Sequence, residues 1–294
     1  MTFARDRRRV LRLMTSALAA TAVMGSQGAF AASLVSAFAQ AVSAAAQDDE
    51  AVAAFYQGRN YATLWTGPAD VARRQALFDL LDTATAHALP SRRYDAAGLR
   101  SKFAAAVTEG DVGRLEVDMT RAYLAIVRDL TSGAVVPAKV ISGVKREIDH
   151  LDPVTSLAAA ESDQFDRFIG NLSPVAPEYA RLMKEKFALE EVMAAGGYGP
   201  VVTADGLAPG DTGPDVVQLR DRLVAVGYLG RSFTQTYDQT ITESVQRFQI
   251  DNGLVADGAA DTRTIAALNI EADQRWRSVV VAMERLRWMR HAPL

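Results

Sequence analysis

The sequence predicts a mainly α protein with a helical first domain, a compact three-helix module and a terminal helix. Apolar residues recur at helical spacing in most segments. No alternating apolar and polar run of strand length lies between residues 70 and 195. Glycines follow several apolar stripes at the position of a helix C-terminus. With 294 residues, 49% hydrophobic and 23% charged, the chain suffices for about two domains with buried cores.

Residues 1–31 have the pattern of an export signal. A cluster of arginines precedes an apolar run from Leu13 to Met24, and Ala29-Phe30-Ala31 fits signal-peptidase cleavage after Ala31. The run is shorter than the ~20 residues that span a bilayer, so no stable membrane span is expected. The pair Arg7-Arg8 resembles a twin-arginine signal, which leaves the Sec and Tat routes open. We expect a mature protein exported to the periplasm or cell envelope.

Composition excludes several classes of function. Without residues 1–31 the chain holds 27 basic and 34 acidic residues, a net charge of −7, which gives no overall basis for binding nucleic acid. The sequence has no cysteine, so disulfides, thiolate zinc sites and thiol nucleophiles are excluded. No paired-histidine zinc motif or glycine-rich phosphate loop occurs, and we expect neither metal nor cofactor.

The first domain is expected over residues 55–199, after an Ala-rich leader (32–54) that is either helical or loosely held. Helices are indicated by apolar positions between residues 77 and 88, between 115 and 130, and between 165 and 193. Pro90 and Gly133 end the first two, Pro174 and Pro177 interrupt the third, and the cluster Gly196 to Pro200 closes the domain.

A module of three short helices is expected over residues 205–270. Its first helix has Val216, Leu219 and Leu223 on one face and ends at Gly227. The second has Ile241, Val245 and Phe248 on its apolar face, begins at a capping box of Thr240 and Glu243, and ends at Gly253. The third opens at Asp261 or Thr262. Residues 271–294 form a last helix, and its apolar face is expected to lie along another surface; this face comprises Trp276, Val279, Val280, Met283, Leu286 and Arg287.

Two sets of motifs resemble known families. The pattern G-D-x-x-P-x-V-x-x-L-x-x-x-L-x-x-x-G-Y (Gly210 to Tyr228) and the motifs from Tyr237 to Leu268 resemble the three-helix peptidoglycan-binding domain. The segments Phe55 to Trp65, His87 to Pro90, residues 114–137 and the terminal MERLRWM resemble the helical scaffold region of the large murein L,D-transpeptidases. At position 88, where that family usually has glycine, this chain has alanine. The resemblance implies that residues 271–294 connect to a catalytic domain, with a cysteine nucleophile and a histidine base, that these residues do not include.

The resemblance implies peptidoglycan as the partner, through its glycan strand or its stem peptide. Tyrosines and arginines near a shallow groove suit both, and Tyr228, Tyr237 and Arg247 are the candidate substrate-binding residues. The alternative is that both tyrosines close the core of the module. Gln249 is expected to hold the following turn by hydrogen bonds rather than to contact ligand.

No catalytic residue is expected in this sequence. L,D-transpeptidation needs a thiolate, and a serine nucleophile would need a placed base. The histidines His87, His150 and His291 lie in separate segments, and we interpret them as surface or end-of-helix residues. Three hypotheses follow: an exported, non-catalytic murein-binding protein; a fragment of an active L,D-transpeptidase; and a scaffold for other cell-wall enzymes that uses the exposed face of the 271–289 helix.

Overall fold

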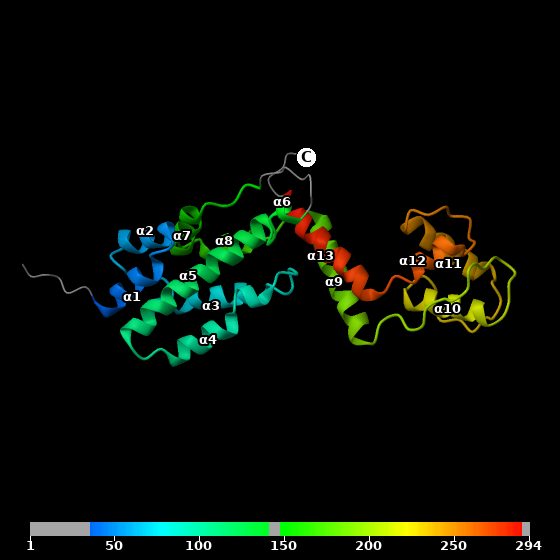
Figure 1. Ribbon diagram of the computed structural model, residues 1–294, viewed down its shortest axis with the longest axis horizontal. Coiled ribbons are helices and arrows are strands. Elements are labelled where there is room, and N and C mark those ends of the chain that lie inside the picture. The colour runs from blue at the N-terminus through cyan, green and yellow to red at the C-terminus, as the bar shows by residue number, and fades with distance from the viewer. Residues whose placement is uncertain (1–35, 141–147, 290–294) are drawn as a thin grey trace, which may run out of the picture. The chain divides into compact units, whose positions relative to one another are not determined.

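The computed structural model describes residues 36–140 and 148–289 (Figure 1). These residues form thirteen α-helices and two 3-10 turns, η1 (Pro68–Asp70) and η2 (Ser91–Arg93), with no named β-strand, so the predicted mainly α fold is confirmed. The α-helices are α1 (Ala37–Ala46), α2 (Glu50–Gly58), α3 (Val71–Asp82), α4 (Ala96–Ala105), α5 (Glu109–Ser132), α6 (Pro137–Val140), α7 (Pro153–Glu161), α8 (Phe165–Gly170), α9 (Pro177–Ala194), α10 (Pro214–Ala225), α11 (Gln239–Asp251), α12 (Thr262–Leu268) and α13 (Ala272–Trp288). The expected signal, residues 1–31, and His291 lie outside the described residues. None of the described helices is long and apolar enough to cross a membrane.

Helix α5 is the centre of the helical first domain. It begins at a capping box in which Thr108 and Asp111 bond each other's backbone N–H groups, and it ends before Gly133, as predicted. Helices α1, α3, α4 and α7 pack around it. The main core lies against its middle and includes Trp65, Leu77 and Ile126. Because neighbours surround α5, it is buried on more than one face, unlike the one-sided stripe of a surface helix.

The Ala-rich leader is a packed part of this domain. Helix α1 lies against α5, and a second core cluster joins Val42, Val52, Tyr56 and Val117. Gly113 permits this close approach, since a Cβ there would lie 2.6 Å from the carbonyl oxygen of Phe38. The expected boundary at residue 55 therefore falls inside α2, because the apolar residues of the leader are buried against α5 rather than left at a loose end.

Ala88 adopts the left-handed backbone conformation. The family that the sequence resembles usually has glycine at this position. Its φ is +53°, and the Leu89 N–H bonds the Ala84 carbonyl oxygen across the turn. Helix α3 ends earlier, at Asp82, and Ala84 is buried beyond it. The substitution thus keeps the turn and adds the strain of a β-carbon at positive φ.

The three-helix module has its own core, and the predicted apolar faces of α10, α11 and α12 are buried in it. Gly227 (φ +84°) and Gly253 (φ +67°) end the first two helices, as predicted. Asp261 is the N-cap of α12, which agrees with one of the two expected starts. The predicted capping box of α11 is wrong. Its N-cap is Asp238, whose carboxylate accepts the Ile241 N–H, so the helix includes Thr240.

Helix α13 lies against α9, and its C-terminal part also meets α5. Met283 and Arg287 are buried, and Trp276 donates its indole N–H to Glu190 on α9 at 3.1 Å. The prediction that this helix lies along another surface is confirmed. Gly133 allows the contact at the other end, because a Cβ there would lie 2.5 Å from Glu284 Oε1 and Trp288 Nε1.

Candidate functional site

The module brings two of the three predicted binding residues together. Arg247, exposed on α11, donates to the backbone oxygen of Tyr228 at 2.8 Å and to Ser244 Oγ at 3.1 Å. The Tyr228 ring stands edge-on to Phe248, with centroids 5.1 Å apart, and its hydroxyl donates to Asp251 at 3.0 Å. Partial burial and this bond raise the pKa of Tyr228 to about 12, so the phenol stays protonated at neutral pH. The result is a surface with a fixed cation and a half-buried tyrosine side by side.

Tyr237 is placed differently. Its side chain is 1% exposed, and its hydroxyl donates to the Gly258 carbonyl oxygen at 2.7 Å inside the core. Burial raises the pKa of this phenol above its usual range. In this conformation its ring offers no surface to a ligand, which corresponds to the alternative that the tyrosine closes the module core.

Gln249 holds the turn after α11, as predicted. Its amide nitrogen donates to Asp257 Oδ1, the Ala259 carbonyl and Thr264 Oγ1, at 3.0, 2.8 and 3.2 Å. Its amide oxygen accepts the Gly258 N–H at 2.9 Å. Four bonds from one buried side chain fix this turn, so Gln249 belongs to the framework of the module.

A second polar cluster, which we call the His87 cluster, consists of His87, Ser173, Tyr179 and Arg287. The Nδ1 atom of His87 lies 3.0 Å from the Tyr179 hydroxyl, and its Nε2 atom lies 3.3 Å from Ser173 Oγ. Arg287 donates to the Tyr179 hydroxyl at 3.2 Å and to the His87 backbone oxygen. No local sequence pattern predicts this cluster, because its other members lie 86 or more residues from His87. The interpretation of His87 as a surface or end-of-helix residue was incomplete, since the ring is half-buried and bonded on both sides.

Tyr179 and Arg287 favour one arrangement of the hydrogen bonds around His87. Burial first, and then the charges of Arg287 and Lys186, lower the pKa of His87 to about 4, so its imidazole is neutral at pH 7. The buried Tyr179 hydroxyl accepts from Arg287, and its own proton has His87 Nδ1 as the acceptor that the described residues offer. In that tautomer the Nε2 atom carries the imidazole proton and donates to Ser173. Such an arrangement is the opposite of a nucleophile and base pair, in which Nε2 must be free to take the serine proton.

Comparison with known families agrees with the division into a helical first domain and a three-helix module. Residues 50–185 match the model of the family described as Scaffold domain, and residues 212–268 match the one described as Putative peptidoglycan binding domain. The chain carries an L,D-transpeptidase Scaffold domain and a peptidoglycan-binding domain. These matches confirm the resemblance drawn from the sequence, and they include no catalytic domain. They indicate a cell-wall-related, peptidoglycan-binding role. No curated protein matches the chain.

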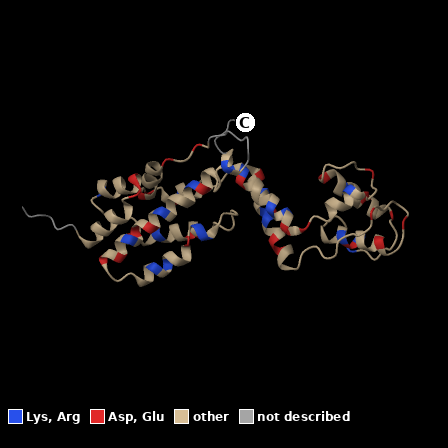
Figure 2. Ribbon diagram, in the orientation of Figure 1, with Lys and Arg blue, Asp and Glu red and all other residues tan. Residues whose placement is uncertain are grey.

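The charges of both domains are mixed. Figure 2 shows acidic and basic residues interspersed over the two domains. Several are paired, such as Arg100 with Asp82 and Lys102 with Asp118. Within the described residues no group of three or more His, Asp or Glu side chains is arranged to hold a metal ion. The domains therefore offer hydrogen-bonding and apolar surfaces rather than a polycationic one.

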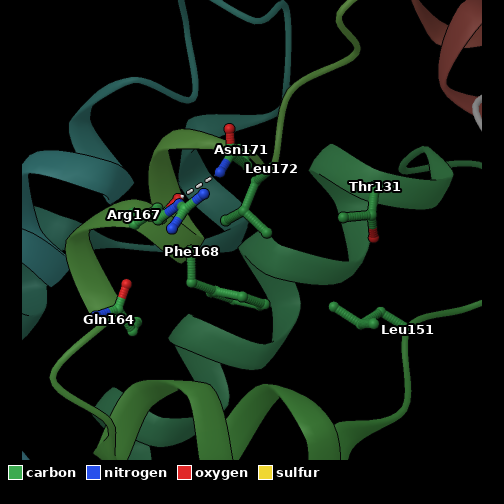
Figure 3. A pocket seen from close by; sticks show the side chains of 7 residues that line it. All are labelled: Thr131, Leu151, Gln164, Arg167, Phe168, Asn171 and Leu172. Carbon is green, nitrogen blue, oxygen red and sulfur yellow. Dashed lines mark hydrogen bonds between the residues drawn. The ribbon is translucent and has the colours of Figure 1, made fainter.

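The Scaffold domain also has a hollow of about 450 Å³ beside α8 (Figure 3). Leu151, Phe168 and Leu172 give it an apolar lining. The Thr131 hydroxyl, however, donates to the carbonyl oxygen of Val127 on its own helix, and the Asn171 amide donates to the Arg167 carbonyl at 2.9 Å. These two polar groups therefore bond to nearby backbone, while the side chains of Gln164 and Arg167 also line the hollow.

Proposed function

We propose that this protein is an exported murein-binding protein, non-catalytic by itself, which acts in cell-wall biogenesis or remodelling. The observation that carries the proposal is the peptidoglycan-binding match over a module with its own core and with side-chain N-caps on α11 and α12. The export-signal pattern expected at residues 1–31 supports a location in the periplasm or envelope.

The absence of cysteine supports the non-catalytic part of the proposal. Acyl transfer in the L,D-transpeptidases that this sequence resembles passes through a thioester, and this chain has no thiol to form one. Ser173, which lies 3.3 Å from His87, meets a donating nitrogen in the tautomer with the proton on Nε2 and has no base there to activate it. Binding rather than turnover is therefore the activity that these residues support.

The proposed contact surface on the module is formed by Tyr228 and Arg247. A guanidinium held by two bonds loses little conformational freedom on binding, and it can pair with stem-peptide carboxylates or carbonyl oxygens. The adjacent tyrosine gives an apolar edge that suits a sugar or peptide backbone.

Sedimentation with purified sacculi tests the proposal. We expect the mature protein to sediment with sacculi and to release no peptide products. Arg247→Gln should reduce the bound fraction about tenfold, whereas Arg263→Gln, an exposed arginine on α12, should leave it unchanged. Tyr237→Phe removes only the bond to Gly258 and should bind normally once folded. Failure of the wild-type protein to sediment, or turnover of a tetrapeptide donor, would contradict the proposal.

A second candidate is that these residues are the non-catalytic part of an active L,D-transpeptidase. The Scaffold match over residues 50–185 favours it. Translation of the coding DNA beyond Leu294 distinguishes the two, because a domain with a cysteine and a histidine there would support the enzyme.

A further inference from the structure

The His87 cluster ends at a hollow that the proposed module surface does not use. Ser173 lies at one end of this hollow, which has a volume of about 420 Å³ and runs along the first turns of α9. Pro177 and Met183 line it, and Val175 and Phe187 rim it with side chains that are 92% and 44% exposed. Exposed apolar groups gathered around one hollow are a feature of binding surfaces, unlike single scattered ones.

The hydrogen-bond chain gives the hollow one oriented donor. Arg287 donates to the Tyr179 hydroxyl, which lies beside His87 Nδ1, and His87 Nε2 lies beside Ser173 Oγ. In the tautomer in which Nδ1 accepts the Tyr179 proton, Nε2 donates to Ser173, so the Ser173 oxygen accepts a bond. The proton of that hydroxyl is left to donate, and Ser173 lines the hollow. A donor whose oxygen is held from behind is preorganised for an acceptor in the hollow.

A cation also lines the hollow. Lys184 lines the hollow, is exposed, and forms no ion pair with a carboxylate among the described residues. Arg287 and Lys186 lie close enough to His87 to bear on its protonation, although Glu284 and Glu190 pair with them. A cation and an oriented hydroxyl beside apolar walls suit a carboxylate attached to a small apolar group. A glycan would need several fixed polar partners for its hydroxyls, which this hollow does not offer.

We propose that this hollow on the Scaffold domain binds the carboxylate end of a murein stem peptide. Ser173 donates to the carboxylate, Lys184 supplies the opposite charge, and Val175 and Phe187 cover the side chain of the terminal residue. The inference rests on the proposed function for its ligand, and it assigns the Scaffold domain a binding role of its own beside that of the module.

Calorimetric titration of the full chain with N-acetyl-D-alanyl-D-alanine tests the site. We expect the free acid to bind, and its methyl ester to bind about tenfold more weakly because the charge is lost. Ser173→Ala should weaken binding of the acid about tenfold. Ser278→Ala, which removes an exposed serine hydroxyl on α13, is the matched control and should bind as the wild type does.

A second variant guards against a change of fold. Phe187→Ala alters a side chain at the rim and should weaken binding about threefold while the circular dichroism spectrum is retained. Lys184→Met should reduce the salt dependence of binding. Equal affinity for acid and ester, no binding by the wild type at millimolar concentration, or wild-type affinity in both Ser173→Ala and Phe187→Ala would overturn the inference.

The two proposals fail separately in these experiments. If the chain sediments with sacculi but does not bind the dipeptide, the stem-peptide site on the Scaffold domain is refuted and murein binding stands. If the dipeptide binds but the chain does not sediment, the proposed function is refuted instead.

Discussion

The Scaffold domain and the peptidoglycan-binding module are stabilised in different ways. In the Scaffold domain and in helix α13, buried charged groups make bonds between segments far apart in the sequence: Glu116, Asp129 and Arg287 are each 1% exposed or less. In the module, the caps and glycine turns are local and Gln249 bonds residues 8 to 15 positions away, although buried Arg222 also donates to the Leu268 carbonyl 46 positions away. The helix ends of the module are therefore specified by short sequence patterns, whereas irregular segments of the Scaffold domain are held by long-range polar contacts such as those of Glu116.

Glu116 is the clearest case of such a contact. Its carboxylate accepts bonds from the Tyr56 hydroxyl, from the N–H groups of Leu64, Trp65 and Thr66, and from the Thr66 hydroxyl. Five donors around one fully buried carboxylate fix the irregular segment that carries Trp65 into the core. A buried charge of this kind is tolerated because its hydrogen bonds are complete.

The largest expected effect comes from Glu116→Gln. The new amide group must face at least one N–H donor, so we expect the Scaffold domain to lose about 3 kcal/mol of stability. Hydrogen exchange by mass spectrometry should show faster exchange in α2, the 63–66 segment and α5, and no change in the module. Asp118→Asn, on the same helix but at an exposed ion pair, should cost less than about 1 kcal/mol. Equal effects of the two variants would contradict the difference between the domains.

A smaller effect is expected from acid. The pKa of His87 is lowered to about 4, against about 6.5 in the unfolded chain. As pH falls from 6.5 to 4 the unfolded state takes up a proton that the folded state does not, so stability present above pH 6.5 is lost in that window. We expect a loss of about 2 kcal/mol, less than the full shift implies because the ring is only half-buried.

Tryptophan fluorescence can follow this loss in urea. All three tryptophans, Trp65, Trp276 and Trp288, lie outside the module, which also contains no histidine. His87→Gln should remove the part of the pH dependence that His87 contributes. The raised pKa of buried Asp129 acts in the opposite direction, so the difference between variant and wild type is the quantity to compare. An unchanged pH dependence in His87→Gln would show that the ring titrates normally.

The smallest effects concern the two left-handed turns. Ala88 in the Scaffold domain and Gly227 in the module have φ values of +53° and +84°. Ala88→Gly should raise stability by about 0.5–1 kcal/mol, and Gly227→Ala should lower it by about 1 kcal/mol through backbone strain alone. No atom lies within 4 Å of a Cβ built at Gly227, so crowding does not contribute. Thermal melts check both, and a destabilised Ala88→Gly would show that the alanine methyl group is needed for packing.

The sequence predicted the module better than the Scaffold domain for a physical reason. Helix ends such as Gly227 and Asp261 are set by backbone preferences of one residue and its near neighbours. The one error in the module, the start of α11, arose because Asp238 and Thr240 are both good N-cap residues and only the backbone conformation selects one. In the Scaffold domain, the packing of α1 on α5 depends on Gly113, whose role is visible only when both helices are in place.

The same division holds for the candidate sites. Tyr228 and Arg247 are candidates from the sequence because tyrosines and arginines suit a glycan or peptide ligand, and the fold places these two together. Tyr237 could not be assigned to surface or core, since its spacing fits both and only burial decides. The His87 cluster could not be predicted, because it joins four segments between residues 87 and 287.

By itself the sequence determined the helical class, the three-helix module, its resemblance to peptidoglycan-binding domains, and the lack of a thiol. These follow from composition and from short-range periodicity, which local physics enforces. Only the tertiary structure decided which charged groups are buried, which side chains meet the two ring nitrogens of His87, and the hollow beside Ser173. Those properties depend on which distant segments exclude water from one another, and no local pattern in the chain records that.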